Sequence, residues 1–104
     1  MTEFVWIKPW IAADKHGQAL VSELNRELNS THKLFEKSHR AIGRRIDCDD
    51  VLFECTDGTF ALVHLTWSGK KDVHPDFPWT KFFLTFQEFT EKVMLPDSYD
   101  YPEH

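Results

Sequence analysis

The chain has 104 residues, of which 41 % are hydrophobic and 28 % are charged, and its formal net charge at pH 7 is −5. A chain of this length builds one hydrophobic core, so we expect a single domain over residues 1–104. No apolar run reaches the roughly 18 residues of a membrane helix. The acidic balance argues against duplex nucleic acid as a partner, because phosphate contacts need clustered Lys and Arg.

Residues 1–18 contain no basic stretch followed by an apolar one, so we expect no secretory signal and a cytoplasmic location. Cys48 and Cys55 would lie roughly 20 Å apart on one extended strand, beyond disulfide reach, and we expect two reduced thiols. Their spacing is a poor zinc motif, and the four glycines are scattered singly rather than gathered in a phosphate-binding loop. The sequence predicts neither a metal nor a cofactor.

The N-terminal region predicts a short strand followed by a helix. Phe4 and Trp6 alternate as in an edge strand, which Pro9 must end or distort. Residues 13–28 then show the period of an amphipathic helix. Its expected apolar positions are Leu20, Val21, Leu24 and Leu28, and its expected solvent-facing positions are Gln18, Glu23, Asn25, Arg26 and Glu27.

The clearest local pattern is a β-hairpin around Asp57-Gly58. Two strand-like runs flank this dipeptide, which suits a two-residue type I′ turn because both central residues then need positive φ. Such a turn places Val51 opposite His64 and puts Asp49 on the same face as His64. One predicted face carries Val51, Phe53, Phe60, Leu62 and His64, and the other carries Leu52, Glu54, Ala61, Val63, Leu65 and Trp67.

Apolar residues on both hairpin faces require cover on both sides, from helices, from the termini or from a partner chain, which makes a homodimer reasonable. Residues 40–46 predict a preceding strand and residues 80–84 a fourth. Thr85 and Glu88 form a capping box, and the helix that follows should stop at Pro96 after about two and a half turns. The expected fold class is α+β, with a three- to four-stranded antiparallel meander and an N-terminal and a C-terminal helix packed on it.

Residues 68–79 are the best candidate for a functional surface, because a loop of this length inside a small domain is more often functional than a hairpin turn. Trp67 is expected in the core. Aromatic side chains held by prolines at a loop end are typical of binding surfaces and also of loops fixed onto a core. The candidate binding residues are Trp79, Phe77, His74, Lys70 and Lys71.

A catalytic interpretation uses His64, whose ring Asp49 would orient in the predicted register, with His74 or Asp76 as the second acid or base. The structural alternative is a core histidine bonded to a neighbour. The ten-residue separation of the two histidines matches no common metal-ligand spacing, so no metal site is predicted.

One basic cluster precedes the hairpin, and the segment from residue 85 onward is acidic. The members of the basic cluster are Lys33, Lys37, Arg40, Arg44 and Arg45. Adjacent Arg44 and Arg45 point to different faces of a strand, so they cannot share one surface. The cluster is either a solvated edge, a contact with the acidic segment within or between chains, or a site for RNA or an acidic protein.

Residues 40–70, the spacing of Pro75, Pro78 and Thr80, and a helix that runs into residues 93–97 resemble a family of small uncharacterised bacterial proteins. The resemblance covers roughly residues 32–97, and its most specific piece is VHLTWSGK at residues 63–70. The family has no assigned activity, so the resemblance implies a bacterial source and nothing catalytic.

The sequence therefore predicts a small cytoplasmic bacterial binding or regulatory module, non-enzymatic, whose surface comes from residues 64–79. Its partner is a protein or a small ligand. One alternative is a hydrolase-like enzyme that uses His64 with Asp49, which requires His64 to reach solvent in a concave pocket. Another is an immunity or inhibitor protein whose acidic surface neutralises a basic toxin.

Overall fold

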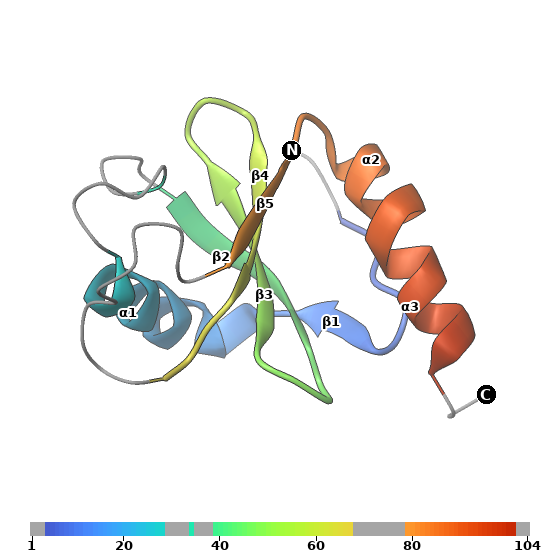
Figure 1. Cartoon of the computed structure of the whole chain (residues 1–104), viewed down its shortest axis with the longest axis horizontal. Coiled ribbons are helices and arrows are strands. Elements are labelled where there is room, and N and C mark those ends of the chain that lie inside the picture. The colour runs from blue at the N-terminus through green and yellow to red at the C-terminus, as the bar shows by residue number, and fades with distance from the viewer. Residues whose placement is uncertain (1–3, 29–33, 35–38, 68–78, 102–104) are drawn as a thin grey trace.

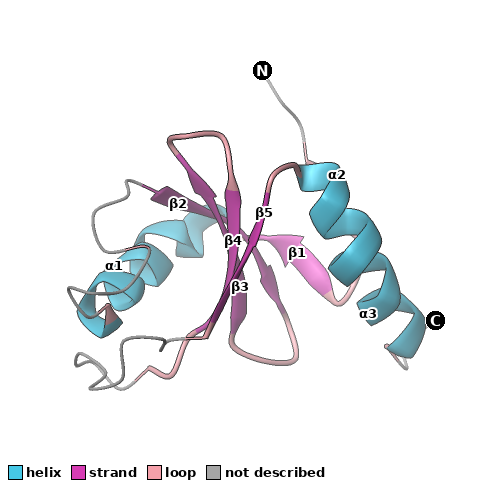
Figure 2. Cartoon of the chain, turned by 45° about the horizontal axis from the view of Figure 1, so that its top comes forward, coloured by secondary structure: helices cyan, strands magenta, loops and turns pink. Residues whose placement is uncertain are grey.

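The computed structural model describes residues 4–28, 34, 39–67 and 79–101. Its strands form one five-stranded antiparallel meander in sequence order: β1 (Trp10–Ala12), β2 (His39–Arg45), β3 (Asp50–Cys55), β4 (Phe60–His64) and β5 (Thr80–Phe83). Figure 1 and Figure 2 show one helix, α1 (Gly17–Glu27), on one side of this sheet and a C-terminal helix on the other. The α+β class is confirmed, and the sheet has five strands where three or four were predicted.

The additional strand is β1, which lies at the edge beside β2 and pairs Trp10 with Arg45. The strand predicted around Phe4 is wrong: a turn closed by a 3.0 Å hydrogen bond from the Trp10 N–H to the Ile7 carbonyl separates this segment from β1. Pairing starts only after Pro9, because proline has no N–H to give to a ladder. Phe4 packs instead against the C-terminal helix, with its ring centroid 4.7 Å from that of Phe86.

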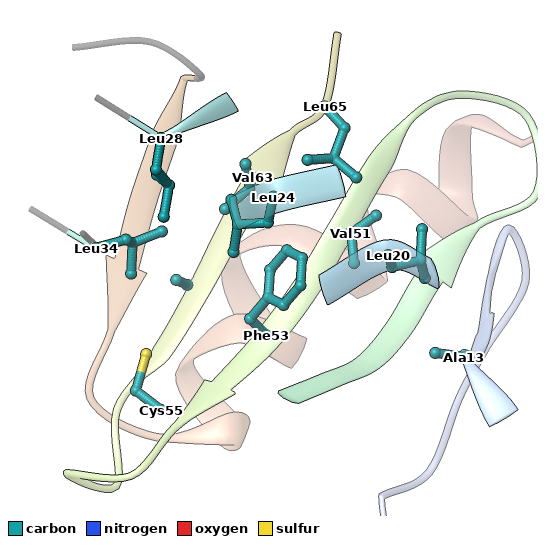
Figure 3. Close-up of a cluster of buried hydrophobic side chains, with 11 residues drawn as sticks. Ala13, Leu20, Leu24, Leu28, Leu34, Val51, Phe53, Cys55, Val63 and Leu65 are labelled. Atoms are coloured by element: carbon teal, nitrogen blue, oxygen red, sulfur yellow. The ribbon is translucent and has the colours of Figure 1, made fainter. Parts of the chain in front are cut away.

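The face of the sheet under α1 carries the first hydrophobic core (Figure 3). A 3₁₀ turn at Asp14–His16 leads into α1, so the helix predicted over residues 13–28 is confirmed. The buried residues of this core are Ala13, Leu20, Leu24, Leu28, Leu34, Val51, Phe53, Cys55, Ala61, Val63 and Leu65. The leucine stripe of α1 therefore faces alternate residues of β3 and β4.

The opposite face carries a second, more aromatic core under the C-terminal helix. Its buried residues are Trp10, Leu52, Phe60, Leu62, Phe83, Phe89 and Met94. The rings pack edge to face: Trp10 and Phe83 each meet Phe89, at centroid distances of 4.9 and 5.7 Å. Such T-shaped pairs add stabilisation beyond the buried area alone.

The C-terminal helix begins at the predicted capping box. The Thr85 hydroxyl accepts a 3.0 Å hydrogen bond from the Glu88 N–H, and the Glu88 carboxylate accepts one of 3.0 Å from the Leu84 N–H. The helix comprises α2 (Phe86–Phe89), a π-helical turn (Thr90–Met94) and α3 (Leu95–Asp100).

The predicted stop at Pro96 is wrong, because the helix continues to Asp100. In the π turn the Leu95 N–H bonds to the carbonyl of Thr90, five residues earlier. Pro96 follows directly, at the start of α3, where proline is tolerated because its fixed φ suits a helix and its missing N–H has no required partner.

Both apolar faces of the sheet are thus covered by helices of the same chain. The reason for expecting a homodimer, an apolar sheet face in need of a partner, is removed. Within the residues that the structure describes, no helix is long and apolar enough to cross a membrane.

Candidate functional site

The hairpin that carries His64 forms as predicted, but its register differs by one residue. The loop has three residues, with hydrogen bonds from the Gly58 N–H to the Cys55 carbonyl (3.0 Å) and from the Cys55 N–H to the Thr59 carbonyl (2.8 Å). Within this loop, only Gly58 has a positive φ, at 88°. This is the pattern of a type I turn closed by a bulge rather than of a type I′ turn.

The shift rearranges both faces of the hairpin. Val51 now pairs with Val63 instead of His64, and Leu52 pairs with Leu62. The α1 side carries Val51, Phe53, Cys55, Ala61, Val63 and Leu65, whereas the side of the C-terminal helix carries Leu52, Phe60 and Leu62. The predicted partner of His64 changes with the register, because Asp50 and not Asp49 lies opposite it.

Asp50, His64 and Trp79 form a row across β3, β4 and the start of β5; we call it the Asp–His–Trp row. His64 Nδ1 lies 2.7 Å from Asp50 Oδ1, and the His64 side chain is 52 % exposed. The His64 N–H donates to the Trp79 carbonyl at 3.0 Å, which extends the β4–β5 register and places these two residues opposite each other. Directly opposed residues project from the same face.

The row has two possible chemical uses. A carboxylate bonded to one ring nitrogen of a histidine selects the tautomer whose other nitrogen accepts a proton, which is the arrangement of a general base. An exposed tryptophan beside an exposed polar pair is equally the composition of a binding surface. Trp79 is 48 % exposed.

Of the other predicted site residues, Asp49 is exposed in the turn between β2 and β3, and its carbonyl accepts a hydrogen bond from the Leu65 N–H at 3.1 Å. Five predicted residues lie outside the described part of the chain: Lys70, Lys71, His74, Asp76 and Phe77. The structure therefore brings together His64 and Trp79 and replaces Asp49 by Asp50.

Within the basic cluster, Arg44 and Arg45 lie on different faces of β2, as predicted, whereas Lys33 and Lys37 lie outside the described residues. Arg45 pairs with Asp47 (2.8 Å) and with Asp97 of α3 (3.4 Å), so it makes the expected contact with the acidic C-terminal segment, within the chain. Asp97 also accepts a 2.8 Å hydrogen bond from the Trp10 indole N–H. These contacts tie the end of the C-terminal helix to the edge of the sheet.

Arg44 lies on the α1 side and lines a pocket of about 170 Å³, together with His16, Ala19, Leu20 and Trp67. Trp67 was predicted in the core, and this prediction is wrong: its side chain is 46 % exposed. β4 ends at His64, and the φ of Trp67 is +58°, a left-handed conformation that is rare for a bulky residue. The backbone therefore leaves the strand before Trp67 and turns the indole out toward Arg44.

A buried carboxylate holds the backbone at this turn. Glu27 is 1 % exposed and accepts hydrogen bonds from the N–H groups of Thr66 (2.9 Å) and Trp67 (2.8 Å). Glu23, one helical turn earlier, is 2 % exposed and pairs with Arg26 at 2.8 Å. The prediction that both glutamates face solvent is wrong. Glu23 and Glu27 follow Leu20 by three and seven residues, and this helical spacing places all three side chains on one face of α1.

Burial raises the pKa of Glu27, and a hydrogen bond with Glu23 raises the pKa further. The N–H groups of Thr66 and Trp67 lower the pKa and offset part of this rise. A hydrogen bond between two carboxyl groups requires a proton on one of them, so the protonated form is favoured here.

Both cysteines are free thiols, as predicted. Cys48 lies on the surface and Cys55 lies in the core. Burial raises the pKa of the Cys48 thiol, which keeps it in the less reactive protonated form. In the described parts of the chain, no three His, Cys, Asp or Glu side chains are grouped so that they could hold a metal ion.

No protein-family model, curated protein or solved structure matches the chain.

Proposed function

We propose that the chain is a small binding module, non-enzymatic, that captures a protein partner through the Asp–His–Trp row and the adjoining residues 68–78. The observation that carries this proposal is the half-exposed Trp79 side chain next to the exposed His64–Asp50 pair. Tryptophan is enriched among the residues that dominate binding energy, because its large ring buries much apolar area with little loss of side-chain freedom.

The position of the row supports a preformed surface. Asp50 and His64 lie on the paired strands β3 and β4, and the Trp79 carbonyl is bonded to the backbone of β4. Groups on a rigid sheet need little ordering when a partner binds, which lowers the entropic cost of association. The two free cysteines fit a reducing compartment, and we place the module in the bacterial cytoplasm.

The test is affinity capture from a bacterial lysate with the full chain, Trp79→Ala and Tyr99→Ala as baits. Tyr99 is exposed on α3 at a distance along the chain from the row, so Tyr99→Ala controls for the loss of an exposed aromatic ring. We expect one partner to be held by the wild type and by Tyr99→Ala and lost with Trp79→Ala. Equal capture by all three baits, with both variants folded by circular dichroism, would contradict the proposal.

A hydrolase-like activity of His64 is the second candidate, because its Nδ1 lies 2.7 Å from Asp50 Oδ1. Binding is favoured over catalysis because the His64 and Trp79 side chains are both about half exposed on the sheet, as in a contact surface. Hydrolysis of an activated ester such as p-nitrophenyl acetate tests this candidate. Turnover that is lost in His64→Ala and kept in His39→Ala, at another histidine of the sheet, would support catalysis, and equal rates in the two variants would exclude a role for His64.

A further inference from the structure

Arg44 differs from the other arginines of the chain. Arg26, Arg40 and Arg45 each pair with a carboxylate, at N–O distances of 2.7 to 2.8 Å. The Arg44 side chain makes no ion pair with a residue that the structure describes, and its buried Nε has no hydrogen-bond partner. A partly buried cation without a counter-ion is costly, and a ligand that carries a negative charge would remove that cost.

The nearest buried carboxylates already have partners. Glu27 binds the backbone of Thr66 and Trp67, and Glu23 binds Arg26. The other polar side chain that lines the pocket is His16, so no acidic side chain is among the described residues of the lining. The charge of the pocket is therefore complementary to an anion.

The remaining lining is apolar: the Trp67 indole and the side chains of Leu20 and Ala19. A free inorganic anion would leave these surfaces unused. The pocket volume of about 170 Å³ is close to the ~150 Å³ of an engineered apolar cavity that holds benzene, so one aromatic ring fits. A guanidinium pairs with a planar carboxylate through two parallel hydrogen bonds.

We propose that this pocket is a binding site for a small organic monocarboxylate of about the size of benzoate. Its carboxylate pairs with Arg44, and its apolar part lies between Trp67 and Leu20. The three hydrogen bonds from the backbone N–H groups of Thr66 and Trp67 to Glu27 hold the backbone that carries the indole. The site lies on the α1 side of the sheet, away from the Asp–His–Trp row, and does not depend on the proposed function.

The experiment is a titration of the ¹⁵N-labelled full chain with benzoate, followed by heteronuclear NMR. The indole N–H resonance of Trp67 is assigned by its loss in Trp67→Phe. We expect saturable shifts at this resonance and at the amides of Ala19 and Leu20. Benzamide, which has the same ring without the charge, should bind at least about tenfold more weakly, as expected when a charge-assisted hydrogen-bonded pair is lost.

Arg44→Gln should weaken benzoate binding by a similar factor, whereas Arg40→Gln, at an exposed arginine of the same strand, should not. Inorganic phosphate should give no saturable shift of the Trp67 indole. The proposal is overturned if benzoate does not saturate the shifts, or if benzamide or phosphate binds the wild type as tightly as benzoate does. It is also overturned if a folded Arg44→Gln variant binds benzoate as tightly as the wild type. If Arg44→Gln does not fold, Arg44→Lys and the comparison of the two ligands on the wild type decide.

Discussion

Glu27 is a buried residue whose side chain links two segments that are far apart in the sequence. Its carboxylate connects the end of α1 to the backbone of residues 66 and 67, which lie 39 and 40 positions later in the sequence. Removing this side chain leaves two backbone N–H groups without their acceptor. Because the Glu27 side chain is buried, its removal costs packing as well as these hydrogen bonds, and the loss of stability should be large for one residue.

We expect Glu27→Ala to lower the free energy of unfolding by about 2–4 kcal/mol, the cost of losing a buried carboxyl group that accepts hydrogen bonds from two backbone N–H groups. Urea denaturation measures the change. Asn25→Ala, at an exposed position of the same helix, is the control and should change the stability by no more than about 0.5 kcal/mol. Equal stabilities of the two variants would show that the Glu27 hydrogen bonds contribute little.

The raised pKa of Glu27 also predicts a pH dependence. Between the unfolded value of 4.5 and the raised folded value, the native state holds a proton that the unfolded chain has released. The contribution of Glu27 to stability is therefore complete below pH 4.5 and is lost as the pH rises through the folded pKa. The stability difference between the wild type and Glu27→Gln should fall over this range in urea denaturation.

Glu88 is a control of opposite sign. The Leu84 N–H, and after it Lys92, lower its pKa, so its contribution is present above the unfolded pKa of 4.5 and is lost as the pH falls through the lowered value. The difference between the wild type and Glu88→Gln should therefore change below pH 4.5 and stay flat above it. A flat difference for Glu27→Gln above pH 4.5 would argue against a raised pKa.

At the scale of the element, the C-terminal helix shows how a cap and a change of helix type replace the expected stop. The capping box sets its beginning, and the π turn brings Pro96 to the start of α3. The helix therefore reaches Asp97, which binds both Trp10 and Arg45. A helix that ended before Pro96 would leave this edge of the sheet without that connection.

Thr85→Ala should destabilise the protein by about 1 kcal/mol, because the Glu88 N–H loses its side-chain acceptor at the helix N-terminus. Thr85→Ser retains the hydroxyl and should recover most of the stability in thermal or urea denaturation. A serine variant as unstable as the alanine variant would mean that the threonine methyl group, and not the cap, accounts for the effect.

At the scale of the whole molecule, a single thin sheet separates two cores that are covered by opposite ends of the chain. The N-terminal segment contributes to the second core, where Trp6 lies against Phe86 with ring centroids 5.2 Å apart. Trp6 also covers Gly43 of β2, at the irregularity between Ala41 and Gly43. A Cβ at residue 43 would overlap the Trp6 indole, so glycine is needed for the N-terminal segment to pack.

Gly43→Ala should therefore lower the free energy of unfolding by about 1–3 kcal/mol, the usual cost of overpacking. In a Trp6→Ala background the cost should fall by about 1 kcal/mol or more, since the two residues are in contact. Both values come from urea denaturation in a double-mutant cycle.

Gly58→Ala provides the matched control for this cycle. Its Cβ would meet nothing within 4 Å, and only the positive φ opposes it, at a cost of about 1–2 kcal/mol. That cost should be the same with and without Trp6. If the cost of Gly43→Ala is also independent of Trp6, the N-terminal segment does not pack over residue 43.

Local patterns in the sequence determined most elements of this fold. The leucine period of α1, the Asp57-Gly58 turn and the Thr85–Glu88 box each depend on neighbours within a few residues, and each predicted element is present. The register of the hairpin could not be determined in this way. Its strands are apolar on both faces, so a slip of one residue still buries hydrophobic side chains, and the hydrophobic pattern does not distinguish the two registers.

The site depended on tertiary structure for the same reason. The hairpin loop decides that Asp50 and not Asp49 meets His64, and contacts between distant segments decide that Glu27 holds residue 67 and that Trp67 turns out toward Arg44. The sequence by itself determined the α+β class, the main elements and the presence of His64 and Trp79 near one candidate surface. Only the packing of α1 against β2 and β4 decided which side chains share a pocket, because those contacts join residues that no local period relates.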